Sequence, residues 1–154
     1  ANAKEFTVGY DRFKDETYIS VTGNIKPTKG KGQNVWKSEA VARTMIPGKT
    51  IAKDVDTFGL TFVTSSMGGW TFLKRHSLIA IIDGERVDFG EGKHSGNPKG
   101  SMVWENIFFL FTRDQLSKIA KAKSVEIQLG DFEGTFDEKG LKRFKQLLEI
   151  TLKQ

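Results

Sequence analysis

The chain of 154 residues contains no cysteine. Disulfide bonds, thiolate zinc sites and cysteine nucleophiles are therefore excluded, and the redox compartment stays open. No apolar run approaches the roughly 18 residues that a membrane-spanning helix requires. The apolar stretch of a signal peptide is missing as well. Because the first residue is Ala1 rather than methionine, we expect either a processed product or a short vector-derived remnant.

The positive charge of the chain is unevenly distributed. The net charge is +5, and residues 25–53 contain seven basic residues and one acidic residue, Glu39. Such a concentration raises association rates with anionic partners, although lysines in loops also serve solubility alone. The length suits one domain. We therefore expect a disordered tail at residues 1–4 and a single domain at residues 5–154, with a basic loop segment at about residues 25–53.

The clearest local signal is a hairpin at residues 78–90. Asp83 and Gly84 separate two arms rich in β-formers, and both residue types tolerate the positive φ angles of a type I′ turn. The first arm, from Leu78 to Ile82, is apolar without interruption. This run predicts an interior strand that is buried on both faces.

Other strands follow from alternation of apolar and polar residues. The best alternating segments are residues 17–22, 58–63, 125–129 and 132–136. Residues 102–111 are apolar on both alternating faces, which predicts a long strand buried on both sides and places Phe108 in the core. Residues 70–73 predict the start of another strand. Residues 91–101 hold three glycines and a proline and predict a polar loop.

Two helices are predicted in the C-terminal half. Thr112 and Gln115 have the spacing of a capping box, which predicts a helix that continues to about Lys121. Asp137 is a suitable N-cap for a last helix with an apolar stripe. The fold class that we predict is α+β, a single domain in which these two helices pack on a hairpin-rich antiparallel sheet.

Four short stretches carry a resemblance to a known group of proteins. They are residues 10–17 (YDRFKDET), residues 82–86 (IDGER), the strand-to-helix junction at residues 105–112, and residues 119–127 (IAKAKSVEI). These stretches resemble small bacterial domains, often exported, whose function is uncharacterised. The resemblance implies a bacterial source and a periplasmic or extracellular location, with a cytoplasmic one still open. It implies no reaction and no catalytic residue, and residues 25–53 match least.

No catalytic or metal-binding motif is complete. Residues 47–50 (PGKT) end like a phosphate-binding loop, but Arg43 stands where that motif needs its first glycine. His76 and His94 are the only histidines, and they lack a metal-ligand spacing. Neither a calcium-loop spacing nor a Gly-x-Ser-x-Gly elbow occurs. We therefore predict no metal, no cofactor and no enzymatic activity.

Two groups of residues are candidates for binding. Trp36 lies inside the basic segment, where it could stack on a base or a sugar. Residues 91–101 bring a histidine, an asparagine and a lysine together in the predicted loop. The full set of candidate ligand-binding residues is Lys26, Lys29, Lys31, Trp36, Lys37, Lys93, His94 and Asn97.

The sequence is compatible with three functions. The first is a non-enzymatic binding or structural module of the cell envelope, whose partner is an unknown protein or an anionic ligand. It should show an apolar patch or a free sheet edge. The second is an anion or nucleic-acid binder, which should show a broad positive face with Trp36 exposed. The third is an enzyme in which His94 meets a buried carboxylate in a closed pocket. Strand order and oligomeric state stay open.

Overall fold

The predicted hairpin forms as expected. Strand β5 (Ser77–Ile82) turns at Asp83 and Gly84, with φ angles of 48° and 86°, into strand β6 (Glu85–Glu91). β5 is an interior strand, since it also pairs with β9 (Val125–Leu129). Only one of its faces is buried, because Ile81 is 41 % exposed. The prediction of burial on both faces was therefore wrong.

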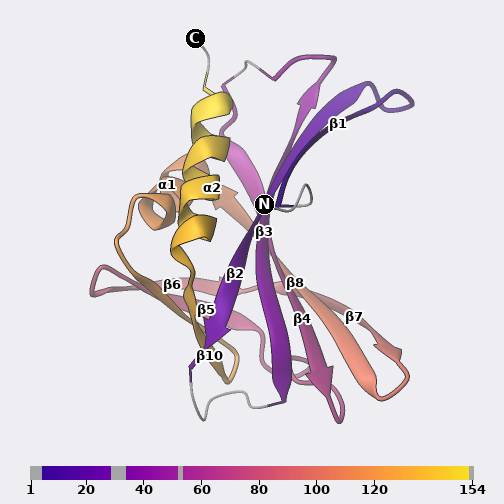
Figure 1. Cartoon of the computed structure of the whole chain (residues 1–154), viewed down its shortest axis with the longest axis vertical. Helices are drawn as coiled ribbons and strands as arrows, with labels where there is room; N and C mark the ends of the chain where they lie inside the picture. The colour runs from indigo at the N-terminus through magenta and orange to yellow at the C-terminus, as the bar shows by residue number, and fades with distance from the viewer. Residues whose placement is uncertain (1–4, 29–33, 52–53, 153–154) are drawn as a thin grey trace.

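The structure is a computed structural model that describes residues 5–28, 34–51 and 54–152. Its ten strands form one antiparallel sheet in the order β6–β5–β9–β10–β2–β3–β4–β8–β7, and β1 pairs with β2 (Figure 1). The other elements are β1 (Phe6–Asp11), β2 (Glu16–Pro27), β3 (Val35–Pro47), β4 (Thr57–Met67), β7 (Lys93–Lys99), β8 (Met102–Thr112), β10 (Phe132–Phe136), α1 (Arg113–Ala120) and α2 (Glu138–Ile150). They make one compact α+β domain, as predicted. The expected tail at residues 1–4 lies outside the described residues.

The sheet curls, and its inner face closes around the core. Phe62 of β4 and Phe136 of β10 come from different halves of the sheet, yet their ring centroids are 6.4 Å apart. Strands β6 and β7 are the two ends of the sheet, and they follow each other in the chain through Gly92. A side chain at this corner would collide with Ile107 and Phe109. Glycine therefore allows the corner to lie directly on the core.

Both helices begin where their capping residues predict. The Thr112 hydroxyl accepts a hydrogen bond from the amide of Gln115, whose side chain accepts one from the Thr112 amide. The Asp137 carboxylate accepts from the amide of Gly140 at the start of α2. A Cβ atom on Gly140 would lie 2.6 Å from the Cα atom of Gly23. The absence of side chains at both positions lets α2 pack directly on β2.

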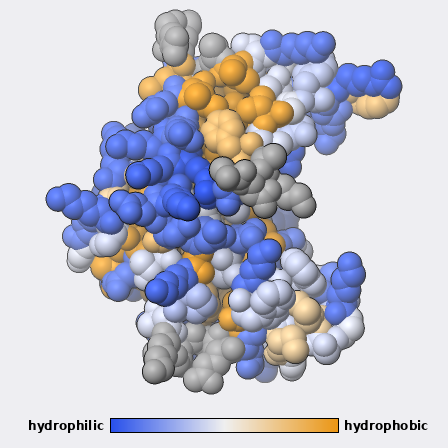
Figure 2. Space-filling view, in the orientation of Figure 1, coloured by the Kyte–Doolittle hydropathy of each residue, from blue (hydrophilic) through white to orange (hydrophobic). Residues whose placement is uncertain are grey.

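Arg113 connects the two helices to the rest of the fold. Its guanidinium donates hydrogen bonds to the carbonyl groups of Val55, Leu148 and Thr151. Figure 2 shows hydrophilic side chains over the solvent side of the helices and apolar ones gathered near the C-terminal end of α2. Within the described part of the chain, neither helix is long and apolar enough to cross a membrane.

Three predicted segments differ from the structure. Residues 91–101, predicted as a loop, contain β7, which is polar because an edge strand pairs on one side only and keeps most of its side chains in water. Residues 70–73, predicted as the start of a strand, form no strand. The amides of Thr71 and Phe72 instead donate hydrogen bonds to the side chain of Glu105 on β8. The basic segment at residues 25–53, expected to be a loop apart from a strand favoured at residues 35–46, includes the end of β2 and all of β3.

Candidate functional site

Strand β8 exposes a line of large apolar side chains. Its inward residues lie in the core, while Trp104, Phe108 and Leu110 point to the outer face of the sheet, away from the core. They are 39, 42 and 67 % exposed, respectively. The prediction that this strand is buried on both sides, with Phe108 in the core, was therefore wrong. The physical reason is that nothing in the described structure covers the outer face of β8.

Polar and cationic residues of β7 lie beside this line. Lys93 is directly opposite Phe108, and Asn97 is directly opposite Trp104. Side chains of opposed residues in an antiparallel pair share one face and lie about 5 Å apart. Lys99 follows at the next outward position of β7. Two of the predicted binding residues, Lys93 and Asn97, are thus brought next to exposed aromatic rings.

The same outer face continues over β4 and β3. The Phe108 ring lies over Gly59 of β4, where a Cβ atom would clash with it. Arg43 of β3 holds its guanidinium 4.8 Å from the centroid of the Tyr18 ring. Lys37 pairs with Glu39 at 3.2 Å.

We call this surface the β8 face, and its members are Trp104, Phe108 and Leu110 of β8, Lys93, Asn97 and Lys99 of β7, and Lys37 and Arg43 of β3. It carries four cations, and the carboxylate of Glu39 beside them is already paired. Trp36 lies at the bulge where the β3–β4 register shifts, and it is 56 % exposed. The β8 face therefore combines exposed rings with an excess of positive charge.

The remaining predicted residues lie elsewhere. Lys26 is at the end of β2, opposite Thr135 of β10. Lys29 and Lys31 lie outside the described residues. His94 projects to the inner side of the sheet, opposite the fully buried Ile107.

His94 meets a buried carboxylate on that inner side. The Glu105 side chain is completely inaccessible, and one of its oxygens accepts a hydrogen bond from His94 Nε2 at 2.9 Å. The same carboxylate accepts from the amides of Thr71 and Phe72, both at 2.9 Å. Three donors thus satisfy a buried charge that would otherwise be strongly unfavourable. Sequence reasoning missed Glu105, because an acid inside an apolar strand shows its partners only after folding.

A second histidine–carboxylate pair stacks on the first. The rings of His76 and His94 have centroids 5.5 Å apart and planes tilted by 29°. His76 Nε2 lies 3.2 Å from Glu91, and its Nδ1 lies 3.0 Å from the carbonyl oxygen of Phe72. Trp70 also lies against His94, with ring centroids 5.8 Å apart.

An enzyme with its site at His94 would require a buried carboxylate and a closed pocket, and this cluster supplies only the carboxylate. The buried carboxylate is present, but its oxygens are already used by two backbone amides and the histidine. Two hollows border the cluster, one lined by Glu91 and one by Trp70, and neither is lined by His94 or Glu105. The pair therefore anchors residues 70–72 on β8. Among the described residues, no group of three or more histidine or acidic side chains is placed to hold a metal ion.

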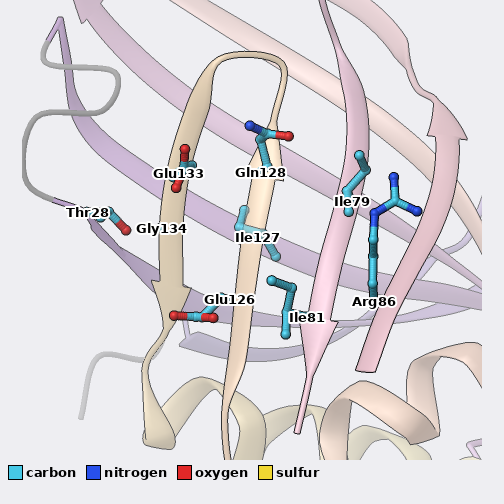
Figure 3. Close-up of a pocket in the computed structure, with 9 residues that line it drawn as sticks. All are labelled: Thr28, Ile79, Ile81, Arg86, Glu126, Ile127, Gln128, Glu133 and Gly134. Atoms are coloured by element: carbon cyan, nitrogen blue, oxygen red, sulfur yellow. The ribbon is translucent and has the colours of Figure 1, made fainter. Parts of the chain in front are cut away.

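The other half of the sheet has a groove on its outer face. It has a volume of about 360 Å³, and Figure 3 shows its walls on β6, β5, β9 and β10. Ile79 and Ile81 of β5 lie between Arg86 of β6 and Glu126 of β9. We call it the β9 groove; its lining residues are Thr28, Ile79, Ile81, Arg86, Glu126, Ile127, Gln128, Glu133 and Gly134. None of the predicted binding residues lines it, because the apolar run of β5 was expected to be buried on both faces.

No protein-family model, curated protein or solved structure matches the chain. Its function is therefore inferred from its own surfaces.

Proposed function

We propose that this protein is a non-enzymatic binding module whose β8 face binds single-stranded nucleic acid. One observation carries the proposal. The exposed rings of Trp104 and Phe108 stand in line on one strand, with Asn97 and Lys93 directly opposite them. Aromatic side chains provide stacking surfaces for bases, and a flanking cationic groove follows the phosphates.

The dimensions and charges of the face suit a flexible anionic strand. Trp104 and Phe108 are four residues apart on β8, which corresponds to about 13 Å along an extended strand. Lys93 and Lys99 lie on the neighbouring strand, and Arg43 lies across β4. The outward positions of β4, β7 and β8 carry no acidic residue. A bound polyanion would therefore meet rings and cations without repulsion from these three strands.

Single strands are favoured over duplexes by the same features. Stacking on a protein ring requires an unpaired base, because duplex bases are already stacked on one another. The β8 face is an open sheet surface, and no helix projects from it to enter a groove of a duplex. An acidic polysaccharide is the competing ligand, and it would suit the envelope location that the sequence resemblance implies.

The test is a titration of the full chain with three polyanions at several salt concentrations. The probes are an oligothymidylate of about 12 nucleotides, within the range of known single-strand sites, a duplex of the same length, and an acidic polysaccharide. We expect the oligothymidylate to bind best and to quench tryptophan fluorescence. Its log affinity should fall linearly with log salt, by about 0.7 per phosphate contact. Preference for the polysaccharide, or no binding to the oligothymidylate at low salt, would overturn the proposal.

A further inference from the structure

Strand β6 is an edge of the sheet with a free row of backbone groups. Within the described residues it pairs only with β5, and Figure 1 shows the β5–β6 hairpin at the left border of the molecule. Ile82 and Glu85 flank the two-residue turn and exchange both of their backbone hydrogen bonds, as the pair next to such a turn does. Hydrogen-bonded pairs recur at every second residue, and the β5–β6 register is regular from this turn as far as Asp88, beyond which it shifts. The backbone N–H and C=O groups of Arg86 and Asp88 therefore point away from β5, toward the free edge.

The space beside this edge is open on the inner side of the sheet. Two hollows of about 460 and 500 Å³ lie beside the edge, and they share Phe89 of β6 and Gln115 of α1; the larger one also reaches Phe108 and Leu110 on the outer face. The Phe89 ring stacks on Phe111, with centroids 4.7 Å apart, and forms the floor. Pairing between β7 and β8 ends at Phe108, so no strand of the described chain fills this space. A further strand can thus lie along β6 with room for its inward side chains.

The charges at the edge indicate which strand fits. Arg86 and Asp88 have opposite signs, are both exposed, and project to the outer face on either side of Val87. Consider a second copy of β6 laid antiparallel on the first, with the two-fold axis at Val87. Arg86 of each copy then stands opposite Asp88 of the other. These are the residues whose backbone groups face the edge, so hydrogen-bond register and charge pairing are satisfied together.

We infer that a second copy of this chain binds at β6, forming a two-fold dimer with a continuous sheet. The interface is isologous, as a C2 dimer requires, because residue 86 contacts residue 88 and residue 88 contacts residue 86. On the inner side the two Val87 side chains meet on the axis, where opposed residues of a non-hydrogen-bonded pair lie closest. A two-strand contact of this length is small, so the dimer dissociates on dilution.

Charge exchange tests the pairing directly. We expect sedimentation velocity of the wild-type chain to show an average mass that rises with concentration. Arg86→Asp and Asp88→Arg each place like charges opposite one another twice per dimer, and each should weaken the dimer about tenfold. The double variant R86D/D88R should restore most of it, because it exchanges the signs of the pairs and loses only the hydrogen bond that the Gly90 amide donates to Asp88 at 2.8 Å. Mixing the two single variants should also restore association, since one copy then presents two acids to the two bases of the other.

A single introduced cysteine tests the two-fold axis. The chain has no cysteine of its own, so Val87→Cys creates one unique thiol. Mild oxidation should give a disulfide-linked dimer, because Cβ atoms of a non-hydrogen-bonded pair lie at the close end of their range, near the roughly 4.5 Å upper limit for a disulfide. Ser95→Cys, on the exposed part of β7, is the matched control and should remain monomeric. A wild-type chain that stays monomeric at every concentration, or a dimer indifferent to both single charge changes, would overturn the inference. The inference would also be overturned if the β6 edge bound a foreign peptide but no second copy of the chain.

Discussion

The β8 face and the β9 groove are outer surfaces of one sheet, and they differ in what their alternating residues present. On β8 the outward positions are rings and a leucine, with lysines on the neighbouring strand. In the β9 groove the outward positions place isoleucines between a guanidinium and carboxylates. The first surface suits a polyanion with flat groups. The second carries charges of both signs and repels a polyanion at its acidic wall.

The comparison shows how much depends on which side of the sheet is covered. Leu78–Ile82 and the segment 102–111 both contain apolar residues on both alternating faces, and both were predicted to be buried on two sides. The helices and the second half of the curled sheet cover only the inner side (Figure 1). The same burial pattern therefore yields one aromatic surface and one mixed-charge surface. Their difference comes from the outward side chains alone.

The largest expected effect concerns the support beneath the β8 face. Glu105→Ala removes the acceptor of His94 and of the amides of Thr71 and Phe72, and we expect it to destabilise the protein by about 3 kcal/mol. The matched change in the β9 groove, Glu126→Ala, is at an exposed position and should change stability by less than about 0.5 kcal/mol. Urea unfolding followed by circular dichroism measures both. Equal effects would show that Glu105 does not anchor residues 70–72.

The two outer faces should differ next in how their variants affect oligothymidylate binding. Trp104→Ala removes a stacking surface and should weaken oligothymidylate binding by about 1–3 kcal/mol, which is roughly five- to 150-fold. Ile81→Ala, a change of an equally exposed apolar residue in the β9 groove, should leave the affinity unchanged. Fluorescence anisotropy of labelled oligothymidylate gives both dissociation constants. Loss of binding in the Ile81 variant alone would move the site to the groove.

A smaller effect distinguishes the cations of the two faces. Lys93→Gln removes one positive charge beside Phe108, and the slope of log affinity against log salt should become shallower by about 0.7. Arg86→Gln removes one positive charge from the β9 groove and, at concentrations low enough to keep the chain monomeric, should leave the slope as it is. Titrations at several salt concentrations measure the slopes. An identical change in both variants would indicate a general effect of net charge instead of a contact at the β8 face.

The smallest effect belongs to the β1–β2 turn, which lies in neither surface. The hydrogen bond that the Tyr10 hydroxyl donates to Asp15, at 2.6 Å, raises the pKa of Tyr10 above its ordinary value of 10.0, and desolvation adds to the rise. Because the folded state favours the protonated phenol, this stabilisation is present below about pH 10. It disappears as pH rises through the folded-state pKa.

Tyr10→Phe tests this dependence. The variant should unfold with less alkaline dependence than the wild-type chain, while binding at the β8 face stays the same. Thermal unfolding at a series of alkaline pH values, compared with Phe13→Ala as the control, measures the difference. An unchanged alkaline dependence would show that the hydrogen bond to Asp15 contributes nothing to stability.

The predictable parts of the fold are those in which neighbouring residues supply the information. The type I′ turn at Asp83 and Gly84, the capping box at Thr112 and the N-cap at Asp137 are all local, and all three are confirmed. Strand β7 was missed because its polar sequence is compatible with a loop until β8 supplies hydrogen-bond partners. For the same reason, Lys93 and Asn97 of the β8 face were predicted as binding residues, while Phe108 and Trp104, which lie opposite them, were predicted to be buried.

The sequence by itself determined the class of this protein: one α+β domain, with its helices in the C-terminal half and its main hairpin in place. Tertiary structure decided which apolar residues are exposed, that Glu105 is buried beneath His94, and that Arg86 and Asp88 face a free edge. The physical reason is that turns and caps depend on residues a few positions apart. Exposure depends on strand order, because each face of a strand is covered only by what the distant chain brings to it.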